Sequence, residues 1–351
     1  MSGSVPGVDL ERLLPWFRAN VGPLDELHAE IIGHGRSNLT YRITAGDQQW
    51  VLRRPPLSHV QPTAHDMKRE FRVISGLAGT DVPVPGTIAL CEDTSVNDAP
   101  FYVMEYVEGF VPADATEFAR RFGEGQRRRI GEELIDILVH LHSIVPADVG
   151  LGDFGKPEGY LERQVRRFTE QLTRVKTRDV PDFEELARRL AAALPSQSGN
   201  GIVHGDYRLD NCILNEEGRI VAVLDWEMAT LGDPLADVGL LMMYWTDEES
   251  GGVPAAPGIA STAITALPGF PTRKEVTSRY AERSGRDLGN LDFYTVLAHF
   301  KLAVILENMH ARYLAGGTVG AGFDVIGQHA LLLATRGLEV ANRSSLAALR
   351  G

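Results

Sequence analysis

Residues 204–225 constrain the fold of this chain more than any other part of its 351 residues. The segment begins with His204-Gly205-Asp206, and Asn211 stands five positions after Asp206. An apolar stretch, a polar turn with glycine and a second apolar run then lead to Asp225. We expect a loop, a strand, a hairpin turn and another strand that ends in an acid. The segment therefore presents two carboxylates and one amide at defined positions.

This set of polar groups fits the transfer of a phosphoryl group. Such a reaction needs an Asp that accepts or orients a hydroxyl proton, and hard oxygen ligands that hold Mg²⁺ on the phosphates. Asp206 supplies the base, and Asn211 and Asp225 supply two metal ligands. The pattern H-x-D-x-x-x-x-N followed by a later acid is the one that protein kinases use. A lone His-Gly-Asp indicates only a capped turn, but the added Asn and Asp favour catalysis.

The remaining sequence divides into a β-rich part and a helical part. In the first hundred or so residues, apolar alternation predicts five short strands, and helical spacing predicts a helix over His65–Leu77. From Gly109 onward helical spacing dominates, as in Gln126–His142. We expect an α+β, bilobal protein-kinase-like fold with a small antiparallel β lobe and a larger, mainly helical lobe. The nucleotide-binding lobe is expected to span residues 1–107, and the catalytic and substrate-binding lobe residues 108–351.

The strands of the β-rich part are expected in four stretches, namely Ile31–Ile43 (two strands around a tight turn), Trp50–Arg53, Val82–Ala89 and Phe101–Val107. An N-terminal helix is expected over Asp9–Asn20, with Asp9 as its N-cap.

Over nearly its whole length the chain resembles the aminoglycoside phosphotransferase (phosphotransferase enzyme) family. The resemblance rests on Asp206–Asn211, on Leu224-Asp225-Trp226-Glu227, and on Gly232-Asp233-Pro234 leading to Asp237-Val238-Gly239. It implies ATP and Mg²⁺ as cofactors, Asp206 as the catalytic residue, and Asn211 and Asp225 as metal ligands. By the same resemblance, Asp237 braces the catalytic loop from the following helix, and His204 gives structural support.

A glycine-containing loop precedes this region. The spacing Gly33-x-Gly35-x-x-Asn38 lacks the third glycine of a kinase loop, so it is a weak signal by itself. It resembles the family's loop Gly-x-x-Ser-Asn-Leu-Thr-Tyr, in which backbone N–H groups near Ser37 and Asn38 cover the ATP phosphates. The alternative is a plain hairpin turn.

Arg53 stands where kinases carry a strand lysine. An arginine can still pair with a phosphate and with a carboxylate on the following helix. We predict that this carboxylate is Glu70, on the helix face opposite the apolar residues. Arg54 is the alternative, although strand alternation turns it to the other side of the sheet. The alternative is that Arg53 and Glu70 form a surface ion pair that binds no nucleotide.

The stretch Met104–Gly109 resembles the hinge between kinase lobes. The resemblance implies that the Glu105 carbonyl and the Val107 N–H read the edge of adenine. The alternative is a strand between lobes that binds no ligand.

The acceptor is indicated by weaker signals. Gly150–Pro157, continuing to Tyr160 and Arg163, is similar to kinase domains related to those fused to acyl-CoA dehydrogenases, which implies hydroxyacyl substrates. The alternative is a loop that merely starts a helix. An aminoglycoside is a polycation and needs a carboxylate-rich pocket, whereas residues 231–351 carry 12 acidic and 10 basic residues. A hydroxyacyl acceptor is therefore favoured over an aminoglycoside.

The composition limits the partners and the compartment. A net charge of -12 argues against a nucleic acid or an anionic membrane as a partner. The two cysteines have no metal-like or paired spacing, which favours a reducing compartment. No secretion signal and no apolar run of about 18 residues is present. We expect a cytoplasmic phosphotransferase whose partner is a small molecule with a hydroxyl group, in an oligomeric state that the sequence does not indicate.

Two classes of function fit these residues. The first is an enzyme that transfers the γ-phosphate of ATP to a hydroxyl, which the presence of Asp206, Asn211 and Asp225 favours. The second is a nucleotide-binding pseudokinase or scaffold, which Arg53 in place of lysine leaves open. A P-loop kinase is excluded because no G-x-x-x-x-G-K-[ST] motif occurs.

Overall fold

A computed structural model of the chain describes residues 5–32, 38–57, 66–247, 261–316 and 323–351. The chain forms two compact units: residues 1–109 with 221–229, and residues 110–220 with 230–351. The first boundary therefore falls two residues after the expected one. The expected second lobe, residues 108–351, includes residues 221–229, but the structure assigns these nine residues to the first unit. Among the described helices, none is long and apolar enough to cross a membrane.

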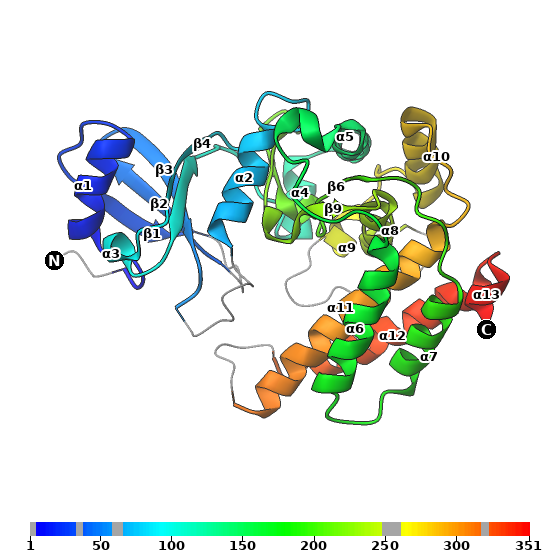
Figure 1. Cartoon of the computed structure of the whole chain (residues 1–351). Coiled ribbons are helices and arrows are strands. Elements are labelled where there is room, and N and C mark those ends of the chain that lie inside the picture. Colours follow the sequence, from blue (N-terminus) through cyan, green and yellow to red (C-terminus); the bar gives the residue numbers. More distant parts are fainter. Residues whose placement is uncertain (1–4, 33–37, 58–65, 248–260, 317–322) are drawn as a thin grey trace. The chain divides into compact units, whose positions relative to one another are not determined.

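The first unit is built on a five-stranded antiparallel sheet (Figure 1). Its strands lie in the order β1-β2-β3-β5-β4. The β2–β3 hairpin closes at the pair Ala45–Gln48, and Gly46 in the turn has a φ of 56°. A two-residue hairpin turn needs positive φ, which glycine adopts at little cost. The strands are β1 His28–Ile31, β2 Leu39–Ala45, β3 Gln48–Arg54, β4 Thr87–Cys91 and β5 Phe101–Glu105.

Each face of this sheet carries a helix. Helix α1 (Leu10–Asn20) begins at the expected N-cap Asp9 and joins Leu13 and Phe17 to a core that includes Leu52 of β3. Strand residues alternate between the two faces of a sheet, so the residues next to Leu52 in β3 point to the opposite face. Helix α2 (Met67–Leu77) lies on that face and packs on β4 and β5. The short helix α3 (Thr94–Asn97) connects β4 to β5. The sheet is thus covered on both sides.

The position of Glu70 differs from the expectation. Glu70 lies on the same buried face of α2 as Met67, Ile74 and Leu77, and it is only 2% exposed. The predicted placement opposite the apolar face was wrong. Residues spaced by three and four positions share one face of a helix, and Glu70 falls into that spacing. A carboxylate at a core position needs a partner.

Several strand boundaries also differ. The strand expected to begin at Ile31 ends there, and the one expected over Trp50–Arg53 begins at Gln48. The strand expected over Val82–Ala89 begins only at Thr87, after Pro83 and Pro85, which cannot donate to a strand ladder. The strand expected over Phe101–Val107 ends at Glu105.

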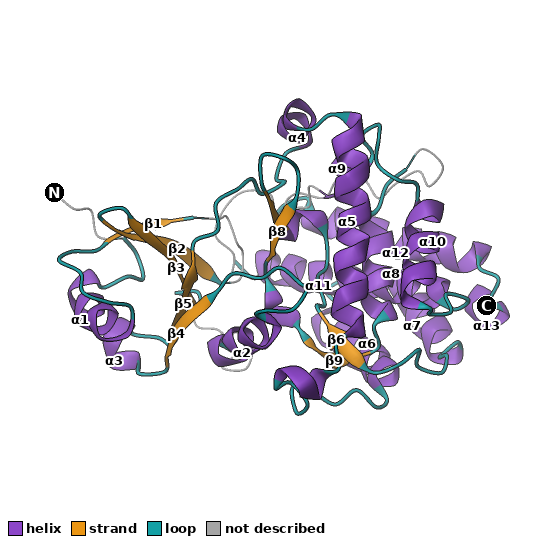
Figure 2. Cartoon of the chain, turned by 90° about the horizontal axis from the view of Figure 1, so that it is seen from above, coloured by secondary structure: helices purple, strands orange, loops and turns teal. Residues whose placement is uncertain are grey.

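The second unit is mainly helical. Helix α11 (Leu291–Leu314) packs against α12, α8, α6 and α7, and Figure 2 shows α10 beside α5. The strands β6 and β9 form a small antiparallel pair, and residues 204–211 follow β6 directly. Besides α11, the helices and strands after residue 109 are α4 Ala115–Arg121, α5 Glu124–Ser143, α6 Tyr160–Val175, α7 Pro181–Ala192, β6 Gly201–Val203, β7 Cys212–Leu214, β8 Ile220–Val223, β9 Thr230–Gly232, α8 Leu235–Tyr244, α9 Ser261–Thr265, α10 Arg273–Ser284, α12 Ile326–Arg343 and α13 Ala347–Arg350.

Helix α8 is buried nearly all round, so its sequence shows no amphipathic period. It approaches α11 closely at Gly239, where an added Cβ atom would lie 2.5 Å from the Cβ atom of Tyr294. This distance leaves no room for a methyl group. Glycine therefore sets the separation of the two helices.

We predict that Gly239→Ala destabilises the second unit by about 1–3 kcal/mol, because an overpacked core must shift its backbone or its side chains. The free energy of unfolding from urea denaturation measures the loss. Gly125→Ala is the matched control, since its Cβ atom would have its nearest neighbour at 3.9 Å. Equal stabilities of the two variants would contradict the prediction.

Candidate active site

Arg53 is the centre of a cluster of carboxylates in the first unit. Its Nε atom lies 3.2 Å from Oε1 of Glu70, as the sequence predicts. Its Nη2 atom lies 2.5 Å from Oδ1 of Asp225 and 3.8 Å from Oε2 of Glu227. Arg54 takes the other face and donates to the carbonyls of Gly7 and Asn97. Strand alternation thus selects Arg53 for the cluster.

Asn38 extends this cluster, because its side-chain N–H donates to Oε2 of Glu227 at 2.9 Å. One guanidinium then faces three carboxylates, of Glu70, Asp225 and Glu227. Burial raises the pKa of Glu70 to about 7, although the charge of Arg53 opposes the shift. The cluster carries more negative than positive charge, which suits the approach of a metal cation.

Asp225 is held in an uncommon backbone conformation. Its φ is 65°, in the left-handed region that residues other than glycine seldom adopt. A short 3₁₀ turn, Trp226–Met228, follows it. The buried indole of Trp226 donates to the Val223 carbonyl at 2.9 Å and anchors that turn. Backbone strain of this kind is often found at functional sites.

Residues 204–211, here called the catalytic segment, lie in the second unit and begin directly after β6. The side chain of Asn211 donates to Oδ2 of Asp206 at 3.0 Å and to the Asp206 carbonyl at 2.8 Å. Nε of Arg208 donates to the same Oδ2 atom at 3.1 Å. The predicted base and the predicted amide ligand are therefore adjacent, and a 3₁₀ turn over Leu209–Asn211 brings them together.

Asp237 on α8 supports this loop, as expected. One carboxylate accepts the backbone N–H of His204 at 2.7 Å and that of Gly205 at 2.8 Å. Behind it, Nε2 of His142 lies 3.3 Å away, and Nδ1 of His142 is 2.7 Å from the Tyr280 hydroxyl. Burial alone raises the pKa of Asp237, but His142 and the loop N–H groups hold it below its usual value. Asp237 is thus a charged brace.

His204 also has a structural position. It is fully buried, and its Nδ1 atom accepts the backbone N–H of Asp206 at 3.2 Å. The ring packs edge-on against Tyr207, whose hydroxyl donates to the Leu134 carbonyl at 2.7 Å. These contacts fix the loop from its buried side.

Three residues in, beside or behind the catalytic segment were not among the predicted site residues. Arg208 joins Asp206 to Asp210, whose Oδ2 atom lies 2.6 Å from Nη1 of Arg208. Lys301 of α11 donates to the Gly205 carbonyl at 2.8 Å, and His142 stands behind the brace. Lys301 had a sequence signal, because it interrupts the apolar run of α11. His142 had none, since only the fold brings it near Asp237.

The expected nucleotide-binding residues have different outcomes. Gly35 and Ser37 lie outside the described residues. Glu105 pairs with Trp50 at the end of β5, and its backbone N–H donates to the Gly86 carbonyl at 2.8 Å. Val107 follows two residues beyond that strand. The roles of Asn38, Glu105 and Val107 towards a nucleotide stay predictions.

Among the described residues, no three His, Cys, Asp or Glu side chains gather to hold a metal by themselves. A magnesium ion takes one or two oxygen ligands from the protein and the rest from phosphates and water. Asn211 and Asp225 have side chains of the right chemistry for that purpose.

Comparison with known proteins identifies the family of this chain. The profile of the Phosphotransferase enzyme family matches residues 28–275. A crystal structure of a Ralstonia eutropha protein, provisionally named an aminoglycoside phosphotransferase, is 34% identical with a TM-score of 0.79, covering 95% of this chain and 98% of that one.

Two relatives are much longer proteins than this chain. Acyl-CoA dehydrogenase family member 10 of Mus musculus is 37% identical over 317 residues, which are 89% of this chain and 29% of the relative. Acyl-CoA dehydrogenase family member 11 of Homo sapiens is 32% identical over 314 residues, 88% of this chain and 39% of the relative. The chain thus spans roughly a third of the length of these relatives.

The family match and the similarity of fold define a kinase-like phosphotransferase, so the expected fold class is confirmed. The chain belongs to the phosphotransferase enzyme family.

We predict that Arg53→Met costs about 3–5 kcal/mol of stability, because it leaves the Glu70 carboxyl buried without its cation. The double variant Arg53→Met/Glu70→Met is expected to lose much less than the two single losses added together. Urea denaturation of the single and double variants measures this coupling. Arg42→Met is the control, since Arg42 pairs with exposed Glu30 and is expected to lose less than about 1 kcal/mol. Strictly additive losses would refute a buried pair.

We also predict a pH dependence of stability from His142. Burial lowers its pKa below the ordinary 6.5. Below pH 6.5 the unfolded chain therefore binds a proton that the folded chain does not, and the free energy of unfolding falls. His142→Gln lacks this proton, so its stability is expected to fall less steeply, by up to about 1.4 kcal/mol per pH unit. Urea denaturation between pH 7.5 and 5.5 measures both slopes. Parallel slopes would show that folded His142 titrates normally.

Proposed function

We propose that this protein transfers the γ-phosphate of ATP to a hydroxyl group of a small molecule, with Mg²⁺ as cofactor. The observation that carries the proposal is the catalytic segment, in which Asn211 donates to Asp206 while Asp237 accepts two consecutive loop N–H groups. This is a fixed carboxylate beside an amide ligand, the pair that phosphoryl transfer requires.

In the proposed reaction, Asp206 takes the proton of the acceptor hydroxyl. The hydroxyl oxygen forms a bond to the γ-phosphorus, and the bond from that phosphorus to the bridging oxygen breaks. The electron pair of that bond leaves on ADP. Each atom is accounted for, because the phosphoryl group moves to the acceptor and the proton moves to the carboxylate. The chain's task is to position the hydroxyl and stabilise the charge.

Asn211 and Asp225 are the residues that we propose as ligands of Mg²⁺, which when bound neutralises the phosphate charge. The net negative charge around Arg53 supports this role for Asp225. Arg53, held by Glu70, is proposed to contact phosphate oxygens. Asn38 and the backbone of Gly35 and Ser37 are proposed to cover the phosphates. The Glu105 carbonyl and the Val107 N–H are proposed to read adenine.

For the acceptor we propose a hydroxyacyl compound rather than an aminoglycoside. The relatives of this chain with the dehydrogenase names support the first choice. The near balance of acidic and basic residues after position 231 speaks against a pocket for a polycation. Both cysteines are free and buried, which supports a reducing compartment, and we propose the cytoplasm.

A screen for transfer of labelled γ-phosphate tests the reaction, with aminoglycosides, hydroxyacyl-CoA compounds and sugars as acceptors. We expect labelled product with the hydroxyacyl class. Asp206→Ala is expected to lower the rate by about 10² or more, as for loss of a general base. Asp225→Ala is expected to weaken nucleotide binding only when Mg²⁺ is present.

Asp287→Asn, in an exposed loop, is the matched control and is expected to keep the wild-type rate. Nucleotide binding without transfer to any acceptor, unchanged by Asp206→Ala, would instead indicate a pseudokinase or scaffold.

A further inference from the structure

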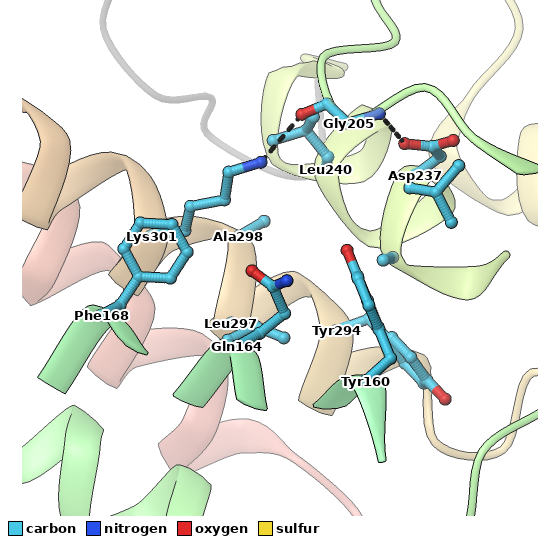
Figure 3. A pocket seen from close by; sticks show the side chains of 12 residues that line it. Tyr160, Gln164, Phe168, Gly205, Asp237, Leu240, Tyr294, Leu297, Ala298 and Lys301 are labelled. Carbon is cyan, nitrogen blue, oxygen red and sulfur yellow. Dashed lines mark hydrogen bonds between the residues drawn. The ribbon is translucent and has the colours of Figure 1, made fainter. Parts of the chain in front are cut away.

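A small pocket in the second unit lies against the catalytic loop (Figure 3). Helix α6 contributes Tyr160, Gln164 and Phe168, and helix α11 contributes Lys301. Gly205, the residue before the proposed base, forms part of the same wall. Anything bound here lies beside the loop that carries Asp206.

Lys301 is unusual among the residues of this pocket. It is partly buried, and its ammonium group donates to the Gly205 carbonyl at 2.8 Å. Within the described parts of the chain, no carboxylate lies within ion-pair distance of Lys301. Burial lowers the pKa of Lys301, although the more distant charges of Asp206 and Asp237 oppose the shift. A cation removed from water without a paired anion is costly to the fold.

The other polar groups of the pocket do not supply that anion. Asp237 also lines it, but its carboxylate already accepts the loop N–H groups and faces His142. The Gln164 amide has no hydrogen-bond partner among the residues that the structure describes. Figure 3 shows this amide and the Lys301 ammonium lining the same pocket. Arg167, one turn along α6, adds a second positive charge near Lys301. The pocket thus offers hydrogen-bond donors and positive charge.

We propose that Lys301, with Gln164 beside it, is the residue that selects the acceptor by binding an oxygen of its acyl group. That oxygen belongs to the carboxylate of a hydroxy acid or to the carbonyl of its thioester. This inference rests on the proposed phosphotransferase function and adds the specificity-determining residue. Because Lys301 also holds the Gly205 carbonyl, the acyl group is fixed relative to the residue that precedes Asp206. A polycationic acceptor is repelled by the same charges.

Kinetics with matched acceptors test the role of Lys301. The panel consists of 2-, 3- and 4-hydroxyhexanoate as free acids, as coenzyme A thioesters and as methyl esters, with kanamycin as the polycation. We expect Lys301→Met to raise the KM for the acids or thioesters about 10- to 100-fold, the range for a lost charged hydrogen bond. The KM for ATP is expected to stay unchanged. Lys301→Arg is expected to restore part of the affinity.

Lys274→Met, at an exposed position on α10, is the matched control and is expected to change neither constant. If the acids respond and the thioesters do not, the recognised oxygen is a carboxylate, and the reverse result assigns a carbonyl. Equal KM values for Lys301→Met and the wild type with every acceptor would overturn the proposal. Efficient transfer to kanamycin that Lys301→Met leaves unchanged would also overturn it.

A binding measurement that needs no phosphoryl transfer separates this proposal from the proposed function. Hexanoate, hexanamide and hexylamine are titrated into the full chain, and the shift in Tm is recorded. We expect hexanoate to raise the Tm most and Lys301→Met to abolish the difference between hexanoate and hexanamide. Equal shifts for the three probes in the wild type would reject Lys301 as the selecting residue. A selective hexanoate shift without any transfer activity would support Lys301 and refute the phosphotransferase function.

Discussion

The carboxylate of Asp237 is the interaction on which the catalytic segment depends. It accepts two consecutive backbone N–H groups, of His204 and Gly205, in a buried position. A charged acceptor makes these hydrogen bonds stronger than neutral ones. Gly205 can serve here because its φ of 85° suits a residue without a side chain. Its N–H is held by an acid and its carbonyl by Lys301. The backbone before Asp206 is therefore fixed by charges of opposite sign.

The first unit uses charge in another way. Arg53 reaches Glu70 through Nε and Asp225 through Nη2, so one planar side chain serves two carboxylates. The point charge of a lysine has no such fork. An arginine at the position predicted to match the kinase lysine can therefore still organise its surroundings. The surplus of carboxylates around it leaves charge for a cation to balance.

The sequence predicted the fold class, and it placed Asp206 and Asn211 together because their spacing is local. The offset from Asp206 to Asn211 is decided within one loop, and the structure shows the two in contact. The prediction for Glu70 was partly right, since its partner was correct and its helix face was wrong. A hydrophobic pattern does not show that a buried position can hold a paired charge. The role of His142 could not be predicted from the sequence, because only tertiary packing brings it to Asp237.

The chain enters the first unit twice, because residues 221–229 join residues 1–109. This second segment is short, yet it contributes Asp225 and the turn that Trp226 anchors. No single cut can therefore separate a complete first unit from this chain. A fragment that stops at residue 109 lacks the carboxylate that pairs with Arg53. Exchange of this unit between relatives needs three junctions in the chain, after residues 109, 220 and 229. Residues 221–229 have to be exchanged together with residues 1–109.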